Sequence, residues 1–180
     1  MLRLRSDVRI TPLGPEHADR MYRWMLDPVV ASSVGLRRDP SPERTLAWIQ
    51  RSMEDPLTSA HAVLLDEQHV GNVVLDRMDM YLKTSRLSVY VGEPSARGNG
   101  VGRTGVYRAM AEGFAKYDLH KIWLTVHANN QDAIKTYLAL RFKVEGVLRD
   151  EFWLENRRVD AYYMGILQPE FAELSNEIAN

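Results

Sequence analysis

The chain has 180 residues, of which 45% are hydrophobic and 26% are charged, a composition ordinary for a globular protein. With 23 basic and 24 acidic residues the formal charge is −1, which argues against a nucleic-acid or membrane surface, since either needs a basic excess on one face. The absence of cysteine excludes disulfides, thiolate metal sites and a cysteine nucleophile. No apolar run reaches the roughly 18 residues that span a bilayer, and no signal segment is visible. We therefore expect one domain over residues 1–180, located in the cytoplasm.

The first half of the chain carries signals for helices and then for a hairpin. Apolar residues at helical spacing predict a first helix, which ends before Pro28 because the residue preceding a proline avoids the helical conformation. Ser41 followed by Pro42 predicts a second helix with the serine as its cap. Two apolar runs then flank a polar turn, which is the pattern of a hairpin. The predicted elements are helices over 16–27 and from 41 onward, and strands over 60–66 and 70–76.

The second half alternates strands with helices and closes on two more strands. Residues from Leu87 to Val91 alternate in polarity, which is the period of a half-buried strand. A continuous apolar run over 122–126 predicts a buried strand. This mixture of hairpins and crossover helices implies a mixed α/β sheet. The predicted elements are strands over 87–92, 122–126, 142–147 and 161–166, and helices over 101–116 and 130–140.

A glycine run, Arg97-Gly98-Asn99-Gly100-Val101-Gly102, lies between a predicted strand and a predicted helix. Alternate glycines let backbone N–H groups approach an anion closely, and the helix N-terminus adds roughly half a positive charge. Two flanking arginines, Arg97 and Arg103, add two full charges. The run therefore predicts a pyrophosphate site, against the simpler alternative of a turn that only reverses the chain. It is neither a Walker loop, which needs Gly-Lys, nor a dinucleotide fingerprint, which needs G-x-G-x-x-G.

A second pattern follows about thirty residues later along the chain. On a helix that starts near Asn130, the residues Ala133, Ile134 and Tyr137 share its face. By itself this stripe is most simply core packing, and the asparagine is most simply a helix cap. Its meaning depends on its separation from the glycine run.

The two patterns together resemble the GNAT superfamily of N-acetyltransferases. That family has a strand, R/Q-G-x-G-x-G/A, a helix, a strand, and then N-x-x-A-I-x-x-Y-x-x-x-G-F. The chain matches it at Arg97 to Gly102 and again at Asn130, Ala133, Ile134, Tyr137 and Phe142. One departure is Arg141, which replaces the usual glycine before the phenylalanine, so we expect that turn to be built differently. The likeness is to the branch that acetylates ribosomal-protein N-termini, polyamines and aminosugars.

The resemblance implies a fold and a co-substrate. The fold is a single α/β domain with a mixed, mostly antiparallel sheet of about six to seven strands, a splayed central strand pair and about four flanking helices. The co-substrate is acetyl-CoA, whose pantetheine arm would bind the backbone of the strand over 87–92 like an added strand. The residues implied in cofactor binding are Tyr90, Val91, Arg97, Gly98, Asn99, Gly100, Val101, Gly102, Arg103 and Asn130.

For catalysis, the resemblance implies direct transfer to an amine in a ternary complex. Tyr137 would act as the general acid toward the leaving thiolate. Many relatives carry a glutamate as base early in the fourth strand, but this chain has Ser85-Arg86 there, so that assignment does not carry over. A water chain is one alternative, and Glu93 and His127 are the nearest side-chain candidates. A structural role is the more common explanation for such a histidine. The five histidines have no metal-ligand spacing, and we predict no metal.

The acceptor is the open question. A small-molecule or peptide amine is implied: an aminosugar nucleotide, a protein N-terminus or a polyamine. Arginines and aromatics expected near the acceptor favour the aminosugar nucleotide, whereas a polyamine site needs carboxylates, for which only Glu54-Asp55 and Asp76 with Asp79 are available. Alternatives are a non-catalytic acyl-CoA-binding module and transfer of a different acyl group. A homodimer is compatible with the sequence. The residues expected to line the acceptor cleft are Arg23, Trp24, Arg37, Arg38, Phe152, Trp153 and Tyr162.

Overall fold

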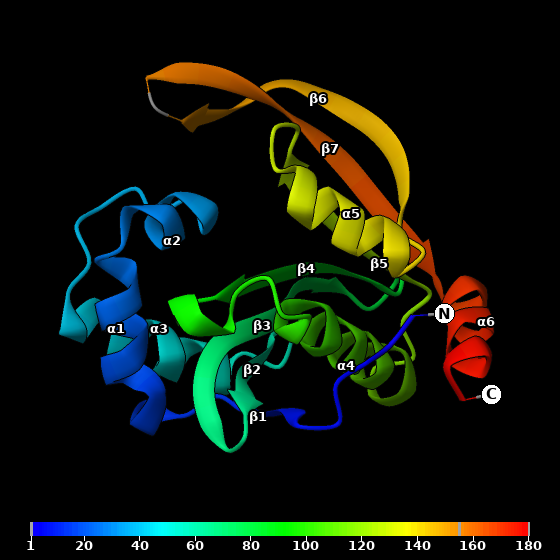
Figure 1. The fold of residues 1–180 in the computed structure, drawn as a ribbon, viewed down its shortest axis with the longest axis horizontal. Coiled ribbons are helices and arrows are strands. Elements are labelled where there is room, and N and C mark those ends of the chain that lie inside the picture. The colour runs from blue at the N-terminus through cyan, green and yellow to red at the C-terminus, as the bar shows by residue number, and fades with distance from the viewer. Residues whose placement is uncertain (1, 155, 180) are drawn as a thin grey trace. The chain divides into compact units, whose positions relative to one another are not determined.

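A computed structural model describes residues 2–154 and 156–179, which fold into helices and strands in mixed order (Figure 1). Contacts group them into two compact units, one built from 4–78 and 87–109 and the other mainly from 79–86 and 110–179. The strands are β1 Val8–Pro12, β2 Ser59–Leu65, β3 Gln68–Asp79, β4 Thr84–Val91, β5 Lys121–His127, β6 Lys143–Leu154 and β7 Arg157–Leu167. The helices are α1 Ala18–Met25, α2 Pro28–Ser33, α3 Pro42–Glu54, α4 Val101–Lys116, α5 Gln131–Ala139 and α6 Gln168–Ala179. Short 3₁₀ turns cover Pro15–His17 and Pro94–Ala96.

The strands form one sheet of seven in the order β1-β2-β3-β4-β5-β7-β6. The pairs β1–β2, β2–β3, β5–β7 and β6–β7 are antiparallel, and β4–β5 is parallel. The β4–β5 register runs from Thr84 opposite Lys121 to Arg86 opposite Trp123. The remainder of β4, from Leu87 onward, belongs to the other compact unit. The predicted fold class, a mixed and mostly antiparallel α/β sheet, is confirmed.

In the unit built from 4–78 and 87–109, α1 and α3 pack together beside β2 (Figure 1). Their apolar faces meet in a cluster that includes Met21, Trp24 and Ile49. The helix starts follow local chemistry: Ser41 accepts a hydrogen bond from Arg44 N at 3.2 Å and Pro42 occupies the first turn, as predicted. The cluster also contains Ala62 and Leu64 of β2, and Tyr90 of β4 packs against it, so α1 is fixed against these two strands.

In the other unit, β6 and β7 pair as a long antiparallel hairpin, and α6 follows β7 along the chain (Figure 1). The rings of Phe114 and Phe171 lie 5.0 Å apart, which anchors α6 to α4. Arg141 adopts a left-handed backbone with φ 69°. The turn that we expected to be built differently therefore keeps a glycine-like conformation, although an arginine occupies it.

Several element boundaries differ from the predictions. Among the described residues there are six α-helices rather than about four, because α2 and α6 were not predicted. Pro28 ends the first helix as expected but also begins α2, since Asp27 turns the chain and accepts a hydrogen bond from Val29 N at 2.9 Å. The last two strands are longer than predicted, and β1 was not predicted. Within the described residues, no helix is long and apolar enough to cross a bilayer.

Candidate functional site

The glycine loop (Arg97–Gly102) has the backbone shape that an anion site requires. Gly98 and Gly100 have φ of 74° and 77°, a left-handed conformation that costs little only for glycine. A Cβ at Gly98 would meet no atom within 4 Å, so the loop is open at that point. The sixteen-residue helix α4 begins directly afterwards at Val101. Positive φ glycines followed by a helix N-terminus fit the diphosphate of a nucleotide-type cofactor.

Side chains around the glycine loop hold its backbone in place. Asn99 Nδ2 donates to the Ser95 carbonyl at 3.2 Å, and the Asn99 carbonyl accepts from Arg5 Nη1 at 3.2 Å. Thr104 Oγ1 accepts a hydrogen bond from Arg5 N at 3.1 Å. A Cβ on Gly102 would lie 3.4 Å from Val91 Cγ2, so the loop packs on the end of β4. The predicted cofactor residues from Tyr90 to Arg103 thus belong to one compact unit.

Arg97 differs from the prediction in what its side chain contacts. Its Nε donates to the Val91 carbonyl at 3.0 Å, and its Nη2 donates to the Gly92 carbonyl at 2.8 Å and to Asp27 Oδ2 at 3.0 Å. This arginine and the Val29 amide hold the pKa of the Asp27 carboxyl below its usual value. The guanidinium that we expected to face an anion is engaged with protein groups.

A buried polar chain behind β4, formed by His69, Asn72 and Tyr90, was not predicted. Asn72 Nδ2 donates to the Tyr90 hydroxyl at 2.7 Å, and Asn72 Oδ1 lies 2.7 Å from His69 Nε2, which therefore carries the proton. Burial raises the pKa of Tyr90 and lowers that of His69 to about 4. The Trp24 ring lies 4.7 Å from the His69 ring. The one available sequence signal was an asparagine inside an apolar strand.

Two glycines, Gly71 and Gly92, allow close packing around the end of β4. A Cβ on Gly71 would lie 2.3 Å from the Tyr90 carbonyl oxygen, and one on Gly92 would lie 2.1 Å from the Trp24 ring. Both positions therefore allow a close approach that any side chain would prevent. The segment of β4 expected to bind the pantetheine arm is held from several sides.

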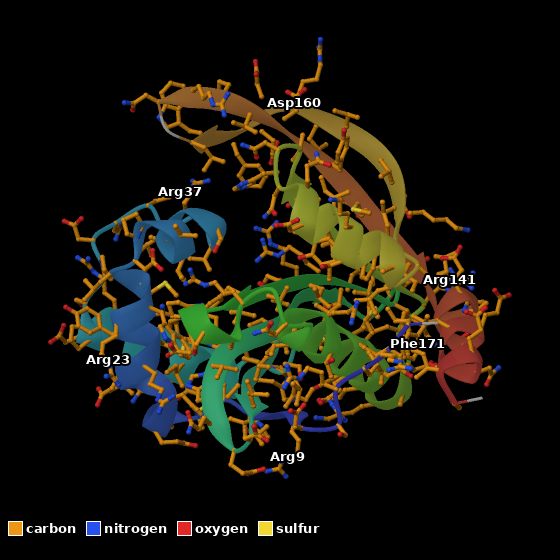
Figure 2. All side chains as sticks on the ribbon, viewed as in Figure 1. Arg9, Arg23, Arg37, Arg141, Asp160 and Phe171 are labelled. Carbon is orange, nitrogen blue, oxygen red and sulfur yellow. The ribbon has the colours of Figure 1, made fainter. Side chains whose placement is uncertain are left out.

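Glu93, a candidate base, borders a cavity of about 620 Å³ in the same unit. Its backbone N–H donates to the Val70 carbonyl at 3.0 Å, which ties the end of β4 to β3. The lining includes two arginines, Arg20 and Arg23, and no residue of the glycine loop. Figure 2 shows Arg23 on α1 and Arg37 on the segment after α2. Glu93 therefore borders the cavity together with two cationic side chains.

In the other unit, α5 presents Asn130 and Tyr137. Asn130 caps the helix, because its Oδ1 accepts a hydrogen bond from Ala133 N at 3.2 Å. Tyr137 is buried with its ring edge toward Phe142, and burial raises its pKa to about 12. Within the described part of the chain, its hydroxyl has no hydrogen-bond partner. The hydroxyl is therefore protonated at neutral pH and available as a donor.

His127, the other candidate base, ends β5. Its ring lies 4.2 Å from the Phe152 ring, and partial burial lowers its pKa. It is therefore neutral at neutral pH and has a lone pair free to accept a proton. No cluster of three or more potential metal ligands occurs in the residues that the structure describes.

The residues expected to line the acceptor cleft differ in how far their side chains are exposed. Trp24 packs in the apolar core at 7% exposure and also lines the cavity beside Glu93 and Arg23. Trp153 on the β6–β7 hairpin is 60% exposed, with the Arg158 guanidinium 5.3 Å from its ring centre. Arg37 and Arg38 lie exposed between α2 and α3. These side chains remain available to a ligand.

Comparisons with known proteins agree on one family. A family model described as an acetyltransferase (GNAT) domain matches residues 7–143. The spermidine N(1)-acetyltransferase of Escherichia coli K12 is 27% identical over 170 residues, covering 91% of this chain and 88% of that protein. That of Vibrio cholerae is 31% identical over 106 residues, covering 59% of this chain and 61% of that protein.

Solved structures agree with this result at the level of the fold. The V. cholerae spermidine N-acetyltransferase, in complex with CoA and spermine, has a TM-score of 0.87 over 93% of this chain and 99% of its own, at 22% identity. The crystal structure of a probable acetyltransferase has a TM-score of 0.81 over 93% of this chain and 97% of its own, at 16% identity.

Proposed function

Since the chain belongs to the acetyltransferase (GNAT) domain family and is an N-acetyltransferase that uses acetyl-CoA, we propose that it transfers the acetyl group directly to an amine of a polyamine. The observation that carries the donor side is the glycine loop, in which two left-handed glycines precede the N-terminus of α4. We propose that residues 1–180 act as one N-acetyltransferase domain. Family membership sets aside a non-catalytic module.

The polyamine is proposed from the relatives, which are named as spermidine N(1)-acetyltransferases in two bacteria. The order of acceptors that the sequence suggested, with an aminosugar nucleotide first, has no support from these names. The charges of this chain keep that acceptor as the second candidate. Asp55 Oδ2 accepts from Thr58 Oγ1 at 2.7 Å and Asp79 Oδ1 accepts from Leu82 N at 2.8 Å, so two of the four expected carboxylates stabilise their own turns. Arg158 over the exposed Trp153 ring instead suits an anionic ligand with a ring.

On the donor side, we propose that the glycine loop binds the acetyl-CoA diphosphate through backbone N–H groups. The backbone of Tyr90 and Val91 would hold the pantetheine arm as an added strand. The buried polar chain and the close approach of Gly71 support this role, because they fix the strand before any ligand arrives. Asn130 is proposed as a further pantetheine contact, in addition to its place as the cap of α5.

Tyr137 is proposed to stabilise the leaving sulfur. The amine nitrogen forms a bond with the thioester carbon, the carbon–sulfur bond breaks, and the electron pair leaves on sulfur. A pKa of about 12 keeps the tyrosine protonated, and it lies above the value of about 8.5 typical of a thiol. Complete proton transfer to the thiolate is therefore uphill, and the raised pKa favours hydrogen-bond donation over full transfer.

The proton released by the amine needs an acceptor. We propose His127 for this role, with Glu93 as the alternative. The lowered pKa of His127 keeps its ring neutral at neutral pH, and its partial exposure leaves a path to water. Glu93 is the second choice because its backbone N–H joins the end of β4 to β3, which gives this residue a structural role.

Two measurements test the proposal. Calorimetry with acetyl-CoA should give saturable binding, and a sample that is folded by circular dichroism yet does not bind would overturn the donor assignment. Free CoA release should then be compared with spermidine, a nucleotide-linked aminosugar and a peptide N-terminus at equal concentration. Turnover of spermidine above the other two supports the polyamine, and turnover of the aminosugar alone replaces it with the second candidate.

Assembly of identical copies is proposed in the same terms. A V. cholerae spermidine N-acetyltransferase has been described as dodecameric, and the present chain exposes apolar side chains such as Val147 and Trp153 on its hairpin. Light scattering coupled to size exclusion should detect a mass at least twice that of one chain, and a strictly monomeric mass at working concentration would contradict it.

A further inference from the structure

We propose that Arg97 is a positioning residue rather than a diphosphate ligand, and that it forms with Asp27 a clamp that sets the glycine loop. The proposal rests on the function proposed above, in which that loop binds the acetyl-CoA diphosphate. The first residue of such a loop would ordinarily be expected to meet the anion with its own charge. In this chain three protein acceptors use that side chain instead.

The Arg97 half of the clamp gathers three oxygens from two elements. Its Nε bonds the Val91 carbonyl at 3.0 Å, and its Nη2 bonds the Gly92 carbonyl at 2.8 Å. Both carbonyls lie at the end of β4, where the strand stops and the chain turns toward the glycine loop. A planar guanidinium with several donors in a fixed fork is suited to hold them together, and an ammonium is not.

The Asp27 half joins the same guanidinium to the start of a helix. Its Oδ2 accepts from Arg97 Nη2 at 3.0 Å, while its Oδ1 accepts from Val29 N at 2.9 Å and so caps α2. Each carboxylate oxygen therefore has its own partner. The ion pair links positions 70 residues apart, so the N-terminus of α2 and the end of β4 are fixed to each other.

The clamp and a direct ligand role make opposite predictions for the loss of the Asp27 charge. If Arg97 bound the diphosphate directly, Asp27 would compete with the ligand, and its neutralisation would tighten acetyl-CoA binding. If the pair sets the loop backbone, its loss weakens binding although a negative charge has been removed. Because the two side chains are each 32% exposed, the pair is partly screened and the effect is moderate.

The decisive variant is Asp27→Asn, because asparagine caps a helix about as well as aspartate and has nearly the same shape. Acetyl-CoA binding to the folded variant, measured by calorimetry, is expected to weaken by at least about threefold, since one charge-assisted hydrogen bond is reduced to a neutral one. Asp19→Asn on α1 is the matched control: it removes the same charge from an exposed position and is expected to leave binding unchanged.

Arg97→Lys provides the second test if the asparagine variant is unstable. The clamp predicts that Arg97→Lys weakens acetyl-CoA binding, since lysine keeps the charge but loses the fork, and that Asp27→Asn adds no further loss in the lysine variant because the pair is already broken. A direct ligand role predicts instead that Asp27→Asn strengthens binding in the lysine variant, since it removes a competing carboxylate. Wild-type protein that binds acetyl-CoA, together with an Asp27→Asn variant that binds equally or more tightly, would overturn the clamp alone. Wild-type protein that does not bind would overturn the donor site instead.

Discussion

The region from β4 to α4 and the region from β5 to α5 are built in different ways. In the first region, the groups proposed to act are backbone N–H and C=O groups. The surrounding side chains already have hydrogen-bond partners within the protein: Arg97 donates to backbone carbonyls and Asn72 donates to Tyr90. In the second, the groups proposed to act are side chains, and the Tyr137 hydroxyl has no hydrogen-bond partner in the described residues. The proposed cofactor-binding region is held in place by hydrogen bonds that are already formed, whereas the proposed catalytic tyrosine keeps a hydroxyl donor that no protein group uses within the residues that the structure describes.

This contrast has a physical reason. A diphosphate carries its charge before and after reaction, so the loop that binds it gains from being rigid and complete in advance. The leaving sulfur becomes negative only during the reaction, so a donor that is already satisfied in the resting protein would be of no use to it. Variants that separate ligand affinity from turnover therefore test the comparison directly.

The largest effect is expected at the tyrosine. Tyr137→Phe removes only the hydroxyl, and we expect kcat to fall by about 100-fold, the lower end for a positioned proton or hydrogen-bond donor. Acetyl-CoA affinity from calorimetry should change little, because the ring still packs against Phe142. Full turnover with unchanged affinity would remove Tyr137 from the chemistry and leave it as a core residue.

The next effect is expected in the glycine loop. Gly100→Asp places a carboxylate beside the proposed diphosphate, and we expect acetyl-CoA affinity to fall by at least about tenfold, or about 1.4 kcal/mol. The φ of 77° at this position strains any side chain, so Gly100→Asn is the matched control, with the same shape and no charge.

The difference in acetyl-CoA affinity between the aspartate and asparagine variants measures the repulsion between the added carboxylate and the proposed diphosphate. Equal losses of affinity for aspartate and asparagine would mean that the loop responds to strain alone, and would count against a bound diphosphate. A Gly102→Ala variant should remain folded, because its Cβ would make an ordinary contact with Val91 at 3.4 Å.

Features that depend on neighbouring residues could be predicted from the sequence, and contacts between distant residues could not. The bounds of α4 and the cap of α5 at Asn130 match the prediction, because both depend on residues within one or two helical turns. The partners of Arg97 and Tyr90 could not be predicted, since Asp27 lies 70 positions away and Asn72 lies 18 positions away. A residue type indicates that a side chain can donate, but tertiary contacts decide to which group.

The same reason explains other contacts that the sequence analysis did not foresee. Trp24 was expected to line the acceptor cleft, but its packing against Gly92, where any Cβ would meet the ring, could not be predicted from sequence spacing. The first helix was predicted correctly to end before Pro28, but α2 depends on Asp27 accepting from Val29 N, which the spacing of apolar residues does not register.

A smaller effect, on stability rather than on binding, is expected from the buried polar chain. Tyr90→Phe leaves the buried Asn72 Nδ2 without its acceptor, which should cost about 1–3 kcal/mol of unfolding free energy. For a chain of this size, thermal unfolding should shift downward by about 2–4 °C for each kcal/mol. Tyr163→Phe is the matched control, since that ring stacks on Trp123 in the other unit, and it should be nearly neutral. Equal shifts for the two variants would show that the chain contributes nothing specific.

The smallest effect concerns pH and tests whether the second region also supplies the base. Burial lowers the pKa of His127 below its reference value of 6.5, and the neutral ring is the form that accepts a proton. If His127 is the base, kcat/KM rises with pH as the imidazole loses its proton. The rising limb of the pH profile then lies below pH 6.5, and kcat/KM is constant around pH 7. His127→Gln should remove the limb and lower the plateau several-fold, about 1 kcal/mol in barrier.

Stability limits the pH range in which this measurement has meaning. His69 has a folded pKa of about 4 and a reference value of 6.5, so the unfolded state binds more protons between these values. The stability that comes from keeping His69 neutral is present above pH 6.5 and is lost as the pH falls toward 4. Rates should therefore be read only where circular dichroism shows a folded protein. A limb that survives in folded His127→Gln would assign the proton to another acceptor, Glu93 or water, and would leave Tyr137 as the one side chain with a chemical role in its region.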